Sequence, residues 1–198
     1  DLRMSRGLGD VYKRQGFSRS MSQAKPSILY ITLGCAKNEV DTDRMRALLN
    51  AAGYDEATDS VEADAVIINT CSFLASASSE SIECTLQLAE EVHDGVRSTP
   101  IVMCGCLPSR YGDDLPEELP EVAAFVPADK EDGIVSVVDR VLGRSERMEV
   151  SVPDVKRTVE GAVAYLKISD GCDRFCSFCA IPYIRGRYAS RSAASILS

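Results

Sequence analysis

Short hydrophobic runs alternate with amphipathic stretches along most of the chain. The runs are bounded by turn residues and predict buried strands at residues 27–33, 65–69, 100–104 and 122–126. Apolar side chains at helical spacing predict helices at residues 41–52, 82–92, 109–119 and 130–142. Gly143 is well placed to end the last helix. A further short strand is expected near Tyr54.

This order of elements predicts an α/β fold. Continuous apolar strands that alternate with helices indicate a parallel sheet with helices on both faces. A later apolar stretch, residues 162–168, predicts one more strand that leads directly into a cysteine-rich loop. We interpret that strand as the start of a second unit, a truncated (β/α) barrel.

The pattern divides the chain into four parts. Residues 1–20 show neither a helix nor a strand period, and we expect them to be a non-native leader before Met21. Residues 21–145 form the predicted α/β domain. Residues 146–161 are charged and turn-rich, as in a linker, and residues 162–198 begin the second domain.

Composition limits the class of protein. The chain has 198 residues, 45% hydrophobic and 26% charged, which is typical of a soluble globular protein. No apolar run reaches the roughly 18–20 residues of a membrane span, so we expect a cytoplasmic protein with no membrane contact. The net charge is −8, and the acidic residues concentrate between two positive ends. An acidic body disfavours nucleic-acid contact and favours a basic partner, although a merely solvated acidic surface explains it equally well.

Cysteine spacing gives the strongest chemical signal. Cys172, Cys176 and Cys179 form a CxxxCxxC motif with no fourth ligand nearby. A [4Fe–4S] cluster usually has four thiolate ligands, so three leave one iron open to a small molecule. Zinc is disfavoured because the single histidine, His93, lies far upstream, and a disulfide framework suits a short secreted chain better.

A second set of three cysteines follows the predicted strands. Cys35, Cys71 and Cys106 each lie just after a strand. Because parallel strands end at the same edge of a sheet, these thiols are expected to meet there. The alternative is that they are small buried residues in turns. That alternative suits Cys84 and Cys104 better, since one falls within a helix and the other within a strand.

The motifs around both sets resemble one known family. The segments ITLGCAKNEVDTDRM, IINTCSFL, VMCGCLPSRY and SDGCDRFCSFCAIPYIRGRYASR occur in this order. Together they resemble the methylthiotransferase family of radical S-adenosylmethionine enzymes. LGCAKN followed by VD is most similar to the branch, the RimO type, that modifies an aspartate of small-subunit ribosomal protein twelve.

The resemblance implies a reaction and its cofactors. Two [4Fe–4S] clusters are implied, a radical cluster on Cys172, Cys176 and Cys179 and an auxiliary cluster on Cys35, Cys71 and Cys106. S-adenosyl-L-methionine would bind the radical cluster, with Phe178 beside its adenine. The implied activity adds sulfur and methyl to the aspartate β-carbon of a basic ribosomal protein, with an electron donor protein as a further partner. The fragment alone is expected to be inactive.

Several alternatives stay open at this point. Asn38 and Asp41 match the family motif but are expected to cap a helix. Arg185, Arg187 and Arg191 are expected to be solvated, and the segment that carries them lacks an arginine and a proline that the family commonly has. Methylthiolation of a transfer RNA adenosine is the alternative reaction. A non-enzymatic iron–sulfur module is the alternative class.

Overall fold

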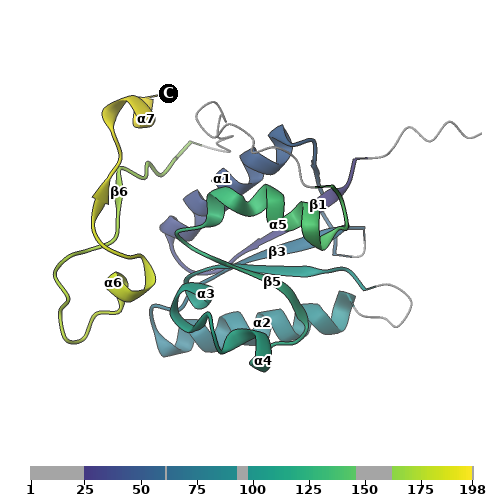
Figure 1. Ribbon diagram of the computed structural model, residues 1–198, viewed down its shortest axis with the longest axis horizontal. Helices are drawn as coiled ribbons and strands as arrows, with labels where there is room; N and C mark the ends of the chain where they lie inside the picture. Colours follow the sequence, from purple (N-terminus) through teal and green to yellow (C-terminus); the bar gives the residue numbers. More distant parts are fainter. Residues whose placement is uncertain (1–24, 61, 93–97, 146–161, 198) are drawn as a thin grey trace, which may run out of the picture.

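A parallel five-stranded sheet forms the centre of the protein (Figure 1). This computed structural model describes residues 25–60, 62–92, 98–145 and 162–197. Neighbouring strands follow the order β2-β1-β3-β4-β5, and every neighbouring pair is parallel. The strands are β1 (Ser27–Thr32), β2 (Asp55–Glu56), β3 (Ala65–Thr70), β4 (Ile101–Gly105) and β5 (Val122–Pro127). The four strands predicted within the first domain, the short strand near Tyr54 and the α/β fold class are confirmed.

Helices cover both faces of the sheet. They are α1 (Ala36–Ala51), α2 (Ala75–Val92), α3 (Cys106–Tyr111), α4 (Leu115–Glu118) and α5 (Ile134–Val141), with a 3-10 turn η1 (Glu131–Gly133) before the last. Helices α1 and α5 lie on one face, and α2 and α4 lie on the other (Figure 1). The helix predicted over residues 109–119 is therefore two short helices, and the first begins at Cys106 itself.

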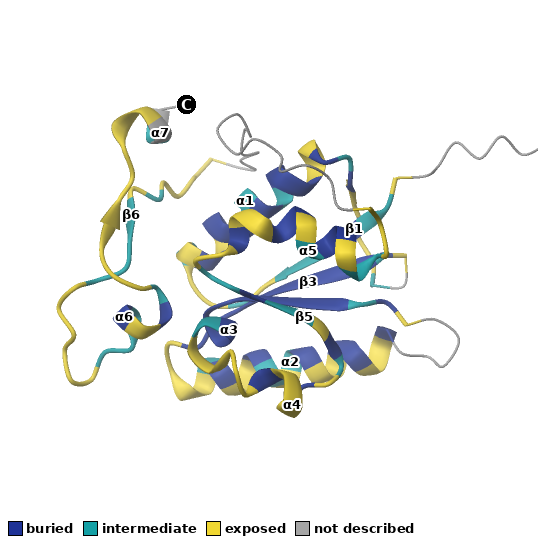
Figure 2. Cartoon of the chain, in the orientation of Figure 1, coloured by how far each residue is buried: buried dark blue, intermediate teal, exposed yellow. Residues whose placement is uncertain are grey.

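Alternation along the central strand explains the two-faced packing. All six residues of β3 are buried, as Figure 2 shows by the dark blue centre of the sheet. Ile67 packs with α1 and α5, whereas its neighbour Ile68 packs with α2 on the opposite face. Successive strand residues point to opposite faces, so a strand covered on both sides must be apolar throughout.

The C-terminal segment, residues 162–197, has little regular structure. It contains the strands β6 (Ser169–Asp170) and β7 (Ala189–Ser190), which pair antiparallel, and the helices α6 (Ile181–Ile184) and α7 (Ala193–Leu197). The strand predicted over residues 162–168 is wrong. Val163 and Leu166 are exposed there, and no strand in the described residues pairs with them, so the ladder that a strand needs is missing.

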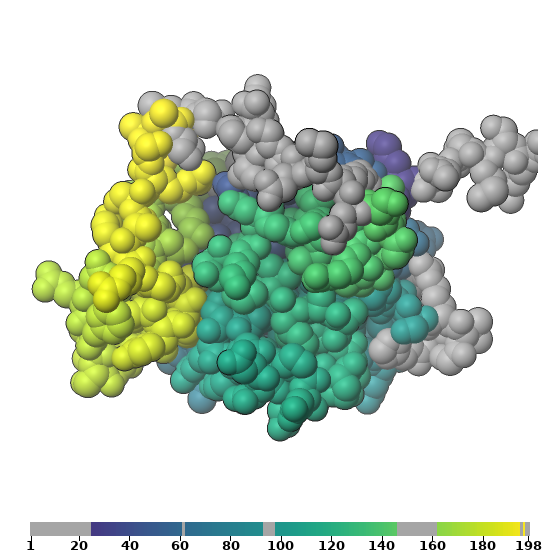
Figure 3. Space-filling view, viewed as in Figure 1, coloured from purple at the N-terminus to yellow at the C-terminus, as the bar shows by residue number. Residues whose placement is uncertain are grey.

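This segment packs against the carboxyl edge of the sheet. Figure 3 shows it in yellow against one side of the body, and α6 contacts α3. Lys37 and Asp41, near the start of α1, form ion pairs with residues of the segment. Residues 1–20 and the predicted linker lie outside the described residues. No helix within the described ranges combines the length and apolar character that a membrane span requires.

Candidate functional site

Three cysteines follow three adjacent strands. Cys35 comes after β1, Cys71 after β3 and Cys106 after β4, and these strands are neighbours in the sheet. Cys71 and Cys106 are buried, whereas Cys35 is exposed. Parallel strands end at one edge, and the sheet therefore brings all three loops to the same place.

Two glycines let these loops approach closely. Gly34 has φ +104°, and a Cβ placed there would lie 2.6 Å from the Cβ of Cys71. Gly105 has φ +93°, and its Cβ would lie 2.2 Å from Oδ1 of Asn69. A side chain at either position would overlap its neighbour and force an unfavourable backbone conformation. The residue before Cys35 and the residue before Cys106 must therefore be glycine to keep this geometry.

A buried amide pair joins the first two loops. The Asn38 side chain donates hydrogen bonds to Oδ1 of Asn69 at 3.0 Å and to the carbonyl of Thr70 at 2.9 Å. The Asn69 side chain donates in return to the carbonyl of Asn38 and to the hydroxyl of Thr42, both at 3.0 Å. Because each of the two side chains bonds to the other residue, the network fixes the start of α1 against the end of β3.

Two hydroxyl groups and a guanidinium fix the Cys71 loop and join it to the strand before Cys106. The Ser81 hydroxyl accepts from the amide of Cys71 at 3.1 Å and donates to its carbonyl at 3.0 Å. The Thr70 hydroxyl donates to the carbonyl of Cys104 at 2.7 Å. The Arg110 guanidinium donates to the carbonyl of Ser72 at 2.7 Å. These contacts hold the backbone on both sides of Cys71 in a defined position.

Opposing effects act on the pKa of the Cys106 thiol. Burial raises its pKa, and the adjacent Cys71 adds to that increase. The Arg185 guanidinium and the backbone of Ser72 oppose the increase. A cation and an amide that favour the thiolate suit a site where sulfur carries negative charge.

The second set of cysteines lies on a loop of the C-terminal segment. The amide of Cys172 donates to the carbonyl of Gly186 at 3.1 Å, and the amide of Cys179 donates to the carbonyl of Cys176 at 3.0 Å. Cys176 is exposed, Cys172 and Cys179 are half-buried, and the Phe178 ring is 92% exposed. A cavity of about 460 Å³ adjoins Cys172. The loop therefore leaves open space beside its thiols.

A cluster of charged residues joins the two cysteine regions. Asp41 is buried and forms ion pairs with Lys167, at 2.6 Å, and with Arg185. Asp170 forms ion pairs with Lys167 and Lys37, each at 2.7 Å. Lys167, Asp170 and Arg185 belong to the C-terminal segment, whereas Lys37 and Asp41 belong to α1. We call these five residues the junction cluster.

The junction cluster shifts the pKa values of its members and of a nearby glutamate. Burial raises the pKa of Glu131 to about 8, and Asp41 adds to the increase. Burial disfavours the charged form of Asp170, but hydrogen bonds from Lys167 and Lys37 outweigh it and lower the pKa of that carboxyl. Glu131 therefore holds a proton at neutral pH, whereas Asp170 stays ionised.

Three expectations about single residues need correction. Neither Asn38 nor Asp41 caps the helix, because Cys35 is the N-cap residue and no side chain bonds to the first-turn amides. Both side chains instead satisfy buried partners. Arg185 is not solvated, since its side chain is only 5% exposed. Arg187 is exposed, as expected, with its guanidinium 5.8 Å from the centre of the Phe175 ring.

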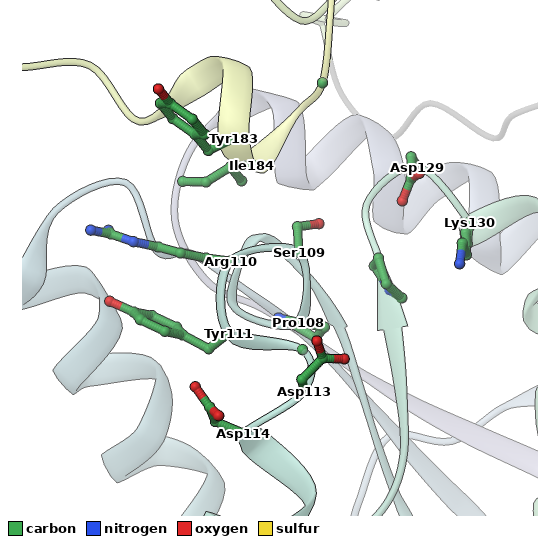
Figure 4. A pocket seen from close by; sticks show the side chains of 13 residues that line it. Pro108, Ser109, Arg110, Tyr111, Asp113, Asp114, Asp129, Lys130, Tyr183 and Ile184 are labelled. Atoms are coloured by element: carbon green, nitrogen blue, oxygen red, sulfur yellow. The ribbon is translucent and has the colours of Figure 1, made fainter. Parts of the chain in front are cut away.

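A second cavity lies next to α3, the helix that begins at Cys106. It measures about 490 Å³ and opens between α3, the turn after β5 and α6 (Figure 4). Charged and aromatic side chains line it, among them Arg110, Tyr111, Asp113, Asp129, Lys130 and Tyr183. Because both signs of charge face the cavity, its lining favours no single class of ligand.

Within the described residues, no group of three or more histidine, cysteine, aspartate or glutamate side chains could hold a metal ion. A [4Fe–4S] cluster makes a different demand, because each of its thiolates binds a different iron and the sulfurs lie further apart than around a single ion.

Known proteins resemble this chain over most of its length. Residues 27–127 match the family described as "Uncharacterized protein family UPF0004". A ribosomal protein uS12 methylthiotransferase RimO of Thermosynechococcus vestitus is 44% identical over 88% of this chain and 40% of that protein. The RimO of Geobacter sulfurreducens is 38% identical over 90% of this chain and 42% of that protein.

The chain thus spans about 40% of the length of the curated relatives it matches. The matched region contains Cys35, Cys71 and Cys106. The resemblance inferred from the cysteine motifs is confirmed, and the chain belongs to the UPF0004 family and is a relative of the RimO methylthiotransferases.

Proposed function

We propose that this chain is part of a radical S-adenosylmethionine methylthiotransferase that modifies an aspartate β-carbon of ribosomal protein uS12. One observation carries the proposal. One cysteine set follows three neighbouring strands at one edge of the sheet, and the junction cluster joins that edge to the segment that carries the other set, in a chain whose relatives are uS12 methylthiotransferases. Sulfur insertion requires two such sites, one for the radical chemistry and one for the sulfur.

Each cysteine set would hold one [4Fe–4S] cluster. Cys35, Cys71 and Cys106 would bind the auxiliary cluster, and Cys172, Cys176 and Cys179 the radical cluster. The close approach at Gly34 and a buried guanidinium beside Cys106 support the first assignment. When bound, the clusters would supply one-electron reduction of S-adenosylmethionine and a place for the incoming sulfur.

The protein's own residues would bind and orient these groups. The exposed Phe178 ring has room to lie against the adenine of S-adenosylmethionine. Asp41 and Arg185 would hold the two sites in a fixed relation, because they join α1 to the end of α6. Positioning of this kind matters in radical reactions, since the reacting atoms must lie close together.

Further parts of the proposal concern organisation and partners. Residues 21–145 would form the auxiliary domain, residues 146–161 a linker, and residues 162–198 the start of the radical domain. The negative net charge of −8 suits a basic substrate such as a ribosomal protein. A separate electron donor protein would deliver the electrons.

A two-substrate assay tests the proposal. The full-length protein is reconstituted anaerobically with iron and sulfide, then supplied with S-adenosylmethionine, a chemical reductant, and either uS12 or transfer RNA. We expect mass spectrometry to detect a methylthio group on one aspartate of uS12 only. A methylthio group found only on the transfer RNA would favour the adenosine-modifying reaction. If S-adenosylmethionine is not cleaved at all, the chain is a non-enzymatic iron–sulfur module.

A further inference from the structure

Arg185 belongs to one cysteine region but lies buried against the other. It follows α6 in the C-terminal segment, and its side chain is only 5% exposed. Its Nη1 atom donates a hydrogen bond to Oδ2 of Asp41, which is almost fully buried at the start of α1. Asp41 thus fixes one half of the guanidinium at the carboxyl edge of the sheet.

The other half of the guanidinium has a free donor. Nη2 of Arg185 is buried and has no hydrogen-bond partner among the residues that the structure describes. A buried donor without a partner is energetically costly, because it has lost its hydrogen bonds to water, and native structures rarely leave one in this state. A donor in such a position is therefore expected to serve an acceptor that binds there.

The Cys106 thiol is the cysteine sulfur that interacts with Arg185. Helix α6 packs on α3, and Cys106 is the first residue of α3. Arg185 lowers the pKa of Cys106 against the effect of burial, both by its charge and by a side-chain hydrogen-bonding interaction. The guanidinium therefore lies beside this thiol, although its Nη2 makes no hydrogen bond of normal geometry there.

We propose that Arg185 is a positioning residue of the Cys35, Cys71 and Cys106 site, and that its Nη2 donates a hydrogen bond to a sulfur of the cluster bound there. The sulfur is the Cys106 thiolate or a cluster sulfide. This inference rests on the proposed auxiliary cluster. It adds that the site is completed by a residue from the segment that carries the other cysteine set.

The arrangement suits arginine in particular. A guanidinium has several donors in a fixed plane, so one edge can bind Asp41 while the other faces a sulfur. The ammonium of lysine is a point charge and cannot span both partners in the same way. A positive charge and a hydrogen bond next to cluster sulfur favour the reduced cluster, which carries one more electron.

The test measures the reduction potential of the auxiliary cluster alone. Cys172, Cys176 and Cys179 are replaced by alanine in the full-length protein, so that only the first site can load iron. Arg185→Met, Arg185→Lys and Arg140→Met are then compared in that background. Arg140 is an exposed arginine of α5 and provides the charge control. Redox titration followed by electron paramagnetic resonance gives the midpoint potential.

We expect Arg185→Met to lower the midpoint potential, Arg185→Lys to lower it less, and Arg140→Met to leave it unchanged. With ¹⁵N-labelled arginine, the reduced cluster should show a nitrogen coupling that Arg185→Met removes. Circular dichroism checks folding, and Arg185→Lys alone decides the outcome if the methionine variant misfolds.

Two failures can be told apart. If the background protein binds no cluster, the proposed auxiliary site is wrong, and this inference fails with it. If the cluster loads but neither Arg185 variant shifts the potential or the coupling, the inference is overturned while the proposed function stands.

Discussion

The two cysteine regions reach their positions by different means. Cys71 and Cys106 are buried and lie on loops that the parallel sheet brings together, although they are far apart in the sequence. Cys172, Cys176 and Cys179 lie close together in one loop that is mostly exposed. The first set depends on the whole fold, whereas the second depends on local sequence spacing.

This difference has consequences for how each region responds to change. At the sheet edge, the cysteines, glycines and amides contact one another through buried groups, and a single substitution disturbs several contacts. In the loop, few side chains are buried, and most substitutions should affect ligand binding rather than stability. The junction cluster is where the two regions depend on each other.

The largest expected effect is a loss of bound iron, which tests whether the two cysteine sets bind separate clusters. Replacing either Cys71 or Cys176 by serine should remove about half of the iron, from about eight to about four atoms per chain, if each set holds its own cluster as proposed. Iron and sulfide are assayed after anaerobic reconstitution of the full-length protein. Cys84→Ser is the control and should bind as much iron as the wild type. If the wild type itself holds only about four irons, there is one cluster and the comparison of two sites fails.

The next largest effect is expected when the contact between the two cysteine regions is broken at the junction cluster. Asp41→Asn removes the closer ion pair of the buried Arg185 and leaves only its longer pair with Asp170, at 3.5 Å, so it should cost about 3 kcal/mol of docking or folding free energy. Lys37→Met removes a half-exposed ion pair with Asp170 and should cost less than about 1 kcal/mol. Urea unfolding gives the free energies, and hydrogen exchange over residues 167–191 shows whether the segment is released. If both variants lose the same free energy of unfolding, the burial of the Asp41 ion pair does not make it more important than the exposed Lys37 pair.

A smaller effect compares two glycines with positive φ. Gly105→Ala should lower the free energy of unfolding by about 3 kcal/mol, because the new Cβ would meet Oδ1 of Asn69 as well as strain the backbone. Gly186 also has a positive φ, +74°, but a Cβ added there would meet nothing within 4 Å. Gly186→Ala should therefore lower the free energy of unfolding by only about 1 kcal/mol. Thermal or urea unfolding measures both. The prediction is wrong if the two variants lose the same stability.

The smallest effect is a pH dependence at Glu131. Its pKa rises from 4.5 to about 8 in the folded protein, so the folded state keeps a proton that the unfolded state releases. Stability should therefore fall as pH rises from 4.5 to about 8, and change little above that. Glu131→Gln should remove this decrease in stability and make the protein more stable than the wild type at the alkaline end, because glutamine stays uncharged. Urea midpoints for both proteins across this range give the result, and parallel pH profiles would contradict it.

Much of the sheet could be predicted from local sequence. The apolar runs around Ile28, Ile67 and Val102 are strands, because a strand buried on both faces must be apolar throughout. The position of each cysteine after a strand followed from the same runs. The stretch at residues 162–168 misled the prediction, since an apolar run forms a strand only where a partner strand can pair with it.

The roles of Asn38, Asp41 and Arg185 could not be predicted. Asn38 bonds to Asn69 and Thr70, and Arg185 bonds to Asp41 across 144 residues of sequence. One signal was present, because Asn69 is a polar residue within an otherwise apolar strand. Such a residue, once buried, needs a hydrogen-bond partner, but the sequence does not show which residue supplies it.

Local sequence is enough to show which cysteines are available, how they are spaced, and that parallel strands carry one set to a common edge. The burial of Arg185 at that edge, its pairing with Asp41, and the raised pKa of Glu131 follow from how the folded chain packs. Strand and motif patterns are local and can be followed along the chain. Burial and charge pairing depend on which distant surfaces meet, and that is fixed only when the chain has folded.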